Sequence, residues 1–264
     1  MTIEAISATS PYVIRRSFTL QSWRDVVFLH WRVDPGAVRP LLPRGTEPEL
    51  QDGSAWVGVI GLRMTGLRLG TLPYPSFLEL NVRLYSVDED GRRGVVFRAM
   101  EATDPVFAAA SRSALRLPYT WSDMRFTRTG GGEVGYSTRR RVPAPAGVGV
   151  RLKVRPAGTA TPSALETALT SRWALHQRWY GETLRMPVNH GPWPLRRAEL
   201  TYWQDTGLAA ACGLPSLDDP PESVLYAAAT TVRFGNGSRV ASPAGAPCRC
   251  RSLVADGLRR YSTG

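Results

Sequence analysis

Residues 78–85 read Leu78-Glu79-Leu80-Asn81-Val82-Arg83-Leu84-Tyr85 and alternate apolar and polar side chains without interruption. Successive side chains of a β-strand point to opposite faces. The leucines and the valine therefore share one face, and Glu79, Asn81, Arg83 and Tyr85 share the other. The polar face is open to two interpretations. It is either the solvated side of a half-buried strand or the wall of a cavity in a curved sheet, where an acid and a planar cation converge on a ligand.

The flanking sequence also predicts strands. Residues 24–33 are apolar on both parities, as in a strand buried on two faces. Residues 56–64 form a second such segment, in which Gly58 and Gly61 permit close backbone approach. Residues 95–100 are expected to return antiparallel after a turn at 88–91. Further strands are predicted over 124–128, 136–142, 147–155, 195–203 and 224–234.

Helices are fewer. An aspartate before a proline, a pattern that starts helices, predicts them over residues 37–42 and 105–117. A capping box at Ser163 and Glu166 predicts a helix that continues to Tyr180 and carries His176 on its apolar stripe. Strands dominate and do not alternate regularly with helices. The pattern favours an α+β fold with a mostly antiparallel curved sheet, closed into a β-barrel, and a few flanking helices.

Length and composition fit one large domain, which we assign to residues 1–239. Of the 264 residues, 43% are hydrophobic, an ordinary value for a globular protein. Residues 240–264 are rich in Arg, Ser and Pro without periodicity and are predicted to be a disordered tail. No apolar run approaches the ~20 residues of a membrane span. The start of the chain lacks the order of a signal peptide, and three cysteines make no disulfide framework, so we expect a cytoplasmic protein.

The net charge of +11 has a compositional origin. All basic residues except Lys153 are arginine, which is typical of a GC-rich genome, and the charges form no long run. Nucleic-acid binders normally concentrate basic residues in a stripe with interleaved aromatics. A basic nucleic-acid-associated protein is therefore the weakest of the functional alternatives. Residues 130–135 match G-x-G-x-x-G, but a β-rich stretch follows them, which indicates a hairpin turn.

Other polar residues stand in apolar surroundings. His30 and Arg32 lie on the first predicted strand, and burial there requires that they be paired or line a cavity. His190 and Trp193 belong to a proline-rich aromatic loop of the kind that often carries function. The spacing of the three histidines predicts no metal site. Lys153 alternates with arginines and is expected to face solvent, where an amine lacks the depressed pKa that catalysis requires.

Several motifs in order resemble one family. They are residues 23–34, Leu41-Leu42-Pro43, Trp56-Val57-Gly58-Val59, residues 79–83, Leu117-Pro118-Tyr119 and residues 190–195. Together they are similar to the uncharacterised YqjF-like proteins, whose fold resembles that of acetoacetate decarboxylase. The resemblance implies a closed, mostly antiparallel barrel around a ligand cavity. It also implies an active-site role for Arg24, ten residues before Asp34. The segment that matches the decarboxylase's Schiff-base lysine, residues 113–119, holds no lysine.

We therefore expect a protein that binds a small carboxylate-bearing or oxygen-rich molecule, and an enzyme that uses neither a Schiff base, a metal ion nor another cofactor. Enolisation, dehydration, cyclisation or a lyase step would fit acid–base chemistry. Glu79, Arg83 and His190 are the candidate catalytic residues. A non-catalytic binding or sensing protein is the alternative, and a homo-oligomer is left open. The residues expected to bind the substrate are Arg24, His30, Arg32, Asn81, Tyr85, Tyr119, Trp121 and Trp193.

Overall fold

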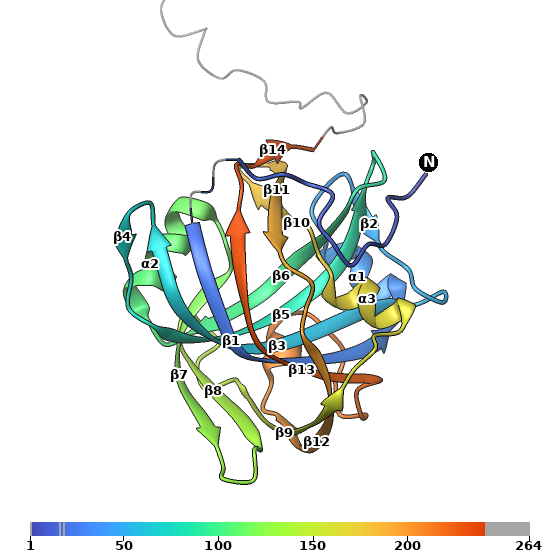
Figure 1. Cartoon of the computed structure of the whole chain (residues 1–264). Helices are drawn as coiled ribbons and strands as arrows, with labels where there is room; N and C mark the ends of the chain where they lie inside the picture. Colours follow the sequence, from blue (N-terminus) through green and yellow to red (C-terminus); the bar gives the residue numbers. More distant parts are fainter. Residues whose placement is uncertain (1, 16, 18, 241–264) are drawn as a thin grey trace, which may run out of the picture.

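A computed structural model describes residues 2–15, 17 and 19–240 of the chain (Figure 1). Within these residues strands dominate, and the helices are few and short. The helices are α1 (Pro35–Val38), the 3-10 helix Arg39–Leu41, α2 (Pro105–Leu115), α3 (Ala164–Thr170) and α4 (Leu208–Ala211). The strands are β1 (Thr19–Val33), β2 (Thr46–Pro48), β3 (Ala55–Leu69), β4 (Leu72–Pro73), β5 (Phe77–Asp88), β6 (Arg93–Ala102), β7 (Tyr119–Arg128), β8 (Val134–Val142), β9 (Val150–Thr159), β10 (Ala174–Trp179), β11 (Glu182–His190), β12 (Leu195–Asp205), β13 (Ser223–Phe234) and β14 (Ser238–Arg239).

Five neighbouring strands form the middle of the sheet. They pair antiparallel in the order β13, β1, β3, β5 and β6. From β6 one route of pairing runs through β10 and β11 and reaches β13. Another runs through β7, β8, β9 and β12 and reaches β13 as well. The predicted mostly antiparallel sheet with few helices is confirmed, whereas its closure as a barrel stays a prediction.

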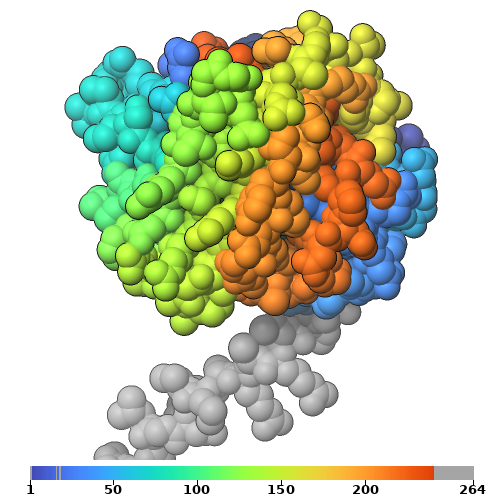
Figure 2. All heavy atoms as spheres, turned by 90° about the horizontal axis from the view of Figure 1, so that it is seen from below, coloured from blue at the N-terminus to red at the C-terminus, as the bar shows by residue number. Residues whose placement is uncertain are grey.

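The middle strands carry an apolar core on each face. One core contains Val27, Val59 and Leu80 together with residues of β8, β9 and β12, the strands that lie side by side in Figure 2. The other contains Phe28 and Ile60 together with residues of β10, β11 and β13. Because β5 lies between the two cores, both of its faces are buried. The polar face of residues 78–85 is therefore interior, and its interpretation as a solvated surface is excluded.

The predicted helix from Ser163 to Tyr180 is wrong beyond its first turns. The capping box at Ser163 and Glu166 is present, but α3 ends at Thr170 and β10 follows. β10 pairs with β11 through a turn in which Tyr180 and Gly181 have φ of 46° and 88°. This hairpin places His176 on a strand, and pairing between strands outweighs the apparent helical spacing. The longest helix of the described residues is α2.

Three smaller predictions have clear outcomes. The glycine run at 130–135 lies in the β7–β8 hairpin, as expected. His190 ends strand β11 and does not lie in a loop. No helix in the described part of the chain is long and apolar enough to cross a bilayer. The predicted tail, apart from Val240, and the Cys248-x-Cys250 pair lie outside the described residues.

Candidate functional site

The face of β5 that carries Glu79, Asn81, Arg83 and Tyr85 is called its inner face. On this face the polar side chains lie opposite residues of β3, which in turn pair with β1. His30 of β1 pairs with Gly58 of β3, which in turn pairs with Arg83 of β5. A Cβ at Gly58 would lie 2.7 Å from the Tyr85 hydroxyl and 3.2 Å from Cγ of Arg83. Because Gly58 has no side chain, the Arg83 and Tyr85 side chains can lie across its backbone.

Glu79 stands at one end of this face and is 1% exposed. The Tyr119 hydroxyl donates to its Oε2 at 2.8 Å, and Nδ2 of Asn81 donates to its Oε1 at 3.1 Å. Burial raises the pKa of the Glu79 carboxyl above its ordinary value, and the two hydrogen bonds partly offset this rise. Burial, together with the nearby Glu79, raises the pKa of Tyr119 well above 10. Tyr119 therefore remains a proton donor to the carboxyl.

A cavity of about 320 Å³ opens beside Glu79. Most of its lining is apolar and comes from α2 and the strands around it, with Phe97, Phe107 and Met186 among the contributing residues. Glu79 and Tyr119 are polar residues of the wall, and Gln21, which accepts a hydrogen bond from Trp23 at 2.8 Å, is another. An apolar cavity with a few convergent polar groups is the usual form of a small-molecule site.

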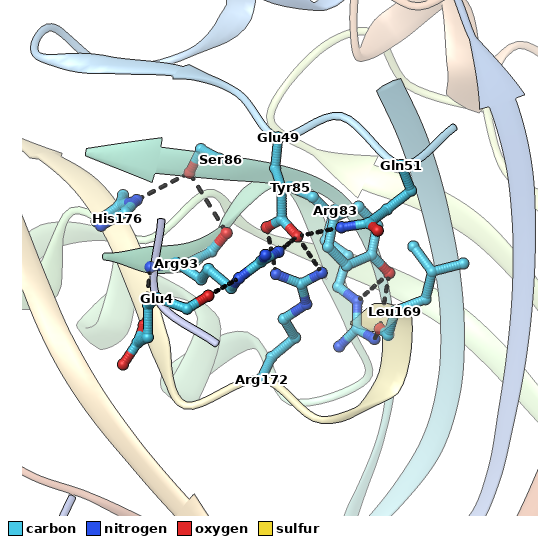
Figure 3. Close-up of polar contacts among 11 residues, drawn as sticks. Glu4, Glu49, Gln51, Arg83, Tyr85, Ser86, Arg93, Leu169, Arg172 and His176 are labelled. Atoms are coloured by element: carbon cyan, nitrogen blue, oxygen red, sulfur yellow. Dashed lines mark hydrogen bonds and ion pairs between the residues drawn. The ribbon is translucent and has the colours of Figure 1, made fainter. Parts of the chain in front are cut away.

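Arg83 and Tyr85, at the other end of the polar face, are anchored to the end of α3. Nη2 of Arg83 and the Tyr85 hydroxyl donate to the Leu169 carbonyl at 2.8 and 3.1 Å, and Nε of Arg83 donates to the Tyr85 hydroxyl at 3.1 Å. These side chains lie beside a buried ion pair between Glu49 and Arg172 (Figure 3). Arg172 also lies over the Tyr85 ring, 4.6 Å from its centroid. This end of the face is held by interactions within the protein.

Several polar atoms on the inner face have no hydrogen-bond partner among the described residues. Both ring nitrogens of His30, Oδ1 of Asn81 and Oγ of Ser223, the β13 residue that pairs with His30, are buried and unpaired. Burial and the charges of Arg83 and Arg172 lower the pKa of His30 well below 6.5, so the ring is neutral. Buried polar groups normally find a partner, so these atoms indicate a place for water or a polar ligand.

His190 and Trp193 form an aromatic group next to this face. The His190 ring lies between Trp173 and Trp193, with centroids 4.4 and 4.7 Å away, and Trp193 contacts Phe28 edge to face at 5.0 Å. Burial lowers the pKa of His190 to about 4. Its Nδ1 lies 2.7 Å from the Gly191 carbonyl oxygen, which can only accept, so Nδ1 carries the proton. This leaves Nε2 of His190 as an acceptor at neutral pH.

Three of the predicted site residues lie elsewhere. Arg24 is exposed. A bulge at Asp25, whose φ is 53°, shifts the β1–β3 register between Arg24 and Val27. Arg24, for which the family resemblance implied an active-site role, therefore lies outside the face that holds His30. Arg32 is exposed and pairs with Glu222 at 2.9 Å.

Trp121 lies on β7 and is 38% exposed. It lines a wider, open hollow of about 1010 Å³ over β7, β8 and β9, whose lining includes neither Glu79 nor Tyr119. The arginines and other charged side chains of this hollow face outward, which is typical of a strand's solvent side. Trp121 is thus not part of the group around Glu79.

Sequence reasoning missed several residues of the site. Gln21 and Trp23 precede the predicted first strand, whereas β1 begins at Thr19. Ser223 of β13 pairs with His30 of β1, and the Leu169 carbonyl near the end of α3 accepts from Arg83. Only the tertiary fold creates these contacts. Lys153 is exposed, as expected, and pairs with Glu133 at 3.7 Å. No three His, Cys, Asp or Glu side chains of the described residues are grouped closely enough to hold a metal ion.

Comparison with known proteins gives one family and one fold. The model of the DUF2071 family, described as an uncharacterized conserved protein, matches residues 20–231. The uncharacterized protein YqjF of Bacillus subtilis is 30% identical over 184 residues, which cover 68% of this chain and 75% of YqjF.

Solved structures with a similar fold include enzymes. An acetoacetate decarboxylase-like enzyme from Sphingomonas wittichii RW1 superposes with a TM-score of 0.60 at 17% identity, covering 88% of this chain and 97% of that one. The enduracididine biosynthesis enzyme MppR complexed with pyruvate gives 0.56 at 16% identity, covering 85% and 91%. Acetoacetate decarboxylase from Legionella pneumophila gives 0.61 at 10% identity, covering 89% and 94%. At these identities the likeness shows the fold alone.

Proposed function

We propose, from the premise that this chain belongs to the DUF2071 family, that it binds a small carboxylate-bearing or oxygen-rich molecule in the cavity beside Glu79 and acts on it as an acid–base enzyme. The observation that carries the proposal is the Glu79 carboxyl, which is buried on the wall of an apolar cavity of about 320 Å³ and has a raised pKa. A carboxyl with a raised pKa can both donate and accept a proton nearer neutral pH.

The apolar lining would hold the carbon skeleton of the ligand, and the groups at Glu79 would orient its reacting oxygen. Tyr119 donates to Glu79 and Asn81 holds the other carboxyl oxygen, so both fix the carboxyl in one orientation. Proton transfer by a positioned carboxyl contributes about 10² to 10⁴ in rate. Enolisation, dehydration, cyclisation and a lyase step all need such a transfer, and the proposal does not extend to a choice among them.

The residues proposed to bind the anionic end of the ligand, Arg83 and His30, lie further along the same face. At about 3.3 Å per residue, the Cα of Arg83 lies about 13 Å along β5 from that of Glu79. A ligand that met both ends would have to be extended, with its anionic end toward Arg83 and the unpaired nitrogens of His30. His190, with Nε2 as an acceptor, and Trp193 lie beside this end. Arg24, Arg32 and Trp121 have no part in the proposed site because they are exposed elsewhere.

The proposal uses no imine. Lys153 is the only lysine of the chain, and its side chain is half exposed on β9, outside the lining of the cavity. The structure of MppR with pyruvate supports a small carboxylate-bearing ligand, since the two proteins share a fold. In the proposal the five middle strands, together with the two series of paired strands that connect β6 to β13, form a rolled sheet that encloses the ligand.

A binding protein without catalysis is the alternative. The observation in its favour is that both oxygens of Glu79 already have hydrogen-bond partners within the protein and that most of the lining is apolar. Such a cavity could retain a ligand unchanged. The two functions differ in the fate of the ligand, which makes them separable by experiment.

The test begins with mass spectrometry of molecules released from purified protein and with ligand-observed NMR of small 2-oxo acids, pyruvate first. Molecules that bind are incubated with wild type, with Glu79→Gln and with the control Glu199→Gln, which alters an exposed carboxyl on β12. We expect turnover to fall at least about 100-fold in Glu79→Gln and to persist in the control. Binding without any turnover by wild type would overturn the enzymatic proposal and leave the alternative. Binding that is unaffected by filling the cavity with Ser111→Phe would overturn both.

A further inference from the structure

A second, smaller pocket of about 180 Å³ lies between β6 and β10. These two strands pair through one residue pair, Leu175 and Val95, and the pocket is lined by residues that follow this pair on both strands. Phe97, Leu117 and Leu175 line this pocket and also the cavity beside Glu79. The two spaces are therefore neighbours that share these apolar residues, and neither Glu79 nor Tyr119 lines the small pocket.

Three arginines surround the small pocket. They are Arg98 of β6, Arg116 after α2 and Arg178 of β10, and within the part of the chain that the structure describes no acidic residue lines the pocket. Arg98 is half-buried, whereas Arg116 and Arg178 are exposed at its rim. This arrangement leaves the cations open to an anion that arrives from solvent.

The partners of these arginines are neutral. Nη1 of Arg98 and Nη2 of Arg178 donate to the same oxygen, the Leu41 carbonyl, at 3.2 and 3.3 Å. Arg98 donates further to the Cys212 carbonyl, and Arg178 to the Leu42 carbonyl. Arg116 lies over the Tyr180 ring at 4.3 Å. Two guanidinium groups that share one carbonyl repel each other, so an anion between them would be stabilised.

Gln177 is a further lining residue of this pocket, and its buried amide is unpaired. Gln177 of β10 is 6% exposed, and both its Nε2 and its Oε1 are buried without a hydrogen-bond partner among the described residues. An amide offers donors and an acceptor at once. A ligand that satisfies both must carry an acceptor atom and a donor group. A partly protonated phosphate has both, whereas sulfate and a carboxylate at neutral pH have acceptors only.

We propose that this pocket is a phosphate-binding site, in which the three arginines bind the anionic oxygens and the buried Gln177 amide turns toward the anion to bind an oxygen and a phosphate hydroxyl. Arginine forms paired hydrogen bonds to phosphate oxygens, and bonds of this kind are among the strongest in proteins. The phosphate would be free or the end group of a small metabolite that enters from the rim. The site does not depend on the function proposed for Glu79.

The test measures binding of inorganic phosphate and of glycerol 3-phosphate to the full chain by calorimetry, with sulfate and acetate as comparison anions. We expect phosphate to bind more tightly than sulfate and acetate. If inorganic phosphate and glycerol 3-phosphate bind equally, the free anion is the ligand that the site recognises. If glycerol 3-phosphate binds more tightly, the ligand is a phosphorylated metabolite. In the double variant Arg116→Gln/Arg178→Gln we expect affinity to fall at least about tenfold. In Gln177→Leu the preference for phosphate over sulfate should be lost.

The matched control is Arg139→Gln/Arg151→Gln, which also removes two exposed arginines, from β8 and β9. It should change phosphate affinity less than twofold. Because the four arginines that are replaced are exposed, circular dichroism should show all double variants folded. No phosphate binding by wild type, or an equal loss in the control, would overturn the site. Both results are independent of whether Glu79→Gln affects turnover.

Discussion

The two ends of the polar face of β5 differ in how their charges are satisfied. Arg83 and Tyr85 close on the Leu169 carbonyl, beside an ion pair in which Arg93 and Arg172 both bind Glu49. Glu79 has two hydrogen bonds from neutral groups and, among the described residues, no cationic partner. One strand face, uniform in sequence, thus anchors its arginine to the protein at one end and leaves a carboxyl with neutral partners at the other.

Breaking the structural end should give the largest loss of stability. In Arg172→Met the buried Glu49 carboxylate loses one of its two arginines, and removing one partner of a buried pair costs about 3–5 kcal/mol. Urea unfolding followed by circular dichroism measures this loss. The control Arg39→Met removes an ion pair with Glu47 that is exposed on both sides, and its cost should stay below about 1 kcal/mol. Equal losses in the two variants would contradict the distinction.

Acid should destabilise the protein through His190. Its folded-state pKa of about 4 lies below the ordinary value of 6.5, so between pH 4 and pH 6.5 the unfolded chain binds a proton more readily than the folded protein does. Stability from this group is complete above pH 6.5 and falls as pH drops to 4, by about 3 kcal/mol in total. The variant His190→Gln should show a smaller difference between unfolding free energies at pH 7 and pH 5. A difference as large as that of wild type would contradict the assignment.

Gly58 lies between Arg83 of β5 and His30 of β1, and adding a side chain there should cost less stability. Gly58→Ala places a methyl group 2.7 Å from the Tyr85 hydroxyl and 3.0 Å from Cδ1 of Ile60. Overpacking of this kind costs about 1–3 kcal/mol. Thermal unfolding of Gly58→Ala and wild type measures this loss of stability. Gly130→Ala, where nothing lies within 4 Å of the added atom, is the control and should stay within about 0.5 kcal/mol of wild type.

Glu79→Gln should have the smallest effect on stability, whatever it does to turnover. The new amide keeps an oxygen for Tyr119 and places its NH2 group where Nδ2 of Asn81 now donates. A turn of the Asn81 amide brings its Oδ1, which has no partner among the described residues, into position to accept from the new NH2 group. Because the folded-state pKa of Glu79 is raised, wild type gains stability below the unfolded value of 4.5 and loses it as pH rises through the folded pKa. The variant should therefore be relatively more stable at pH 7 than at pH 4. The opposite trend in paired urea titrations would mean that the carboxylate is stabilised by the fold.

The sequence allowed the residues that share the polar face of β5 to be predicted because their alternation is local, whereas it left open whether that face is solvated or interior. Local patterns also predicted the hairpin at 130–135 and the exposed side chain of Lys153. Arg24 was misplaced since a one-residue bulge at Asp25 shifts the β1–β3 register without any change in composition. The end of α3 was misplaced because β10 gains its pairing from β11.

The partners of the site residues were beyond local reasoning. Arg83 meets Leu169 across 86 residues of chain, and Tyr119 meets Glu79 across 40. Tyr119 and Trp193 were identified through a family resemblance, whereas Gln21 and Ser223 had no local signal at all. Alternation predicts which way a side chain points, and the tertiary fold decides which group it meets.

The central claim is that Glu79 is a carboxyl whose charge the fold disfavours beside a ligand cavity. Carbon-13 NMR of the chain labelled at glutamate carboxyl carbons, with the Glu79 signal assigned by its loss in Glu79→Gln, measures its titration directly. We predict a midpoint above 4.5 that moves when a ligand fills the cavity. A midpoint at or below 4.5, unchanged by any ligand that binds, would contradict the account.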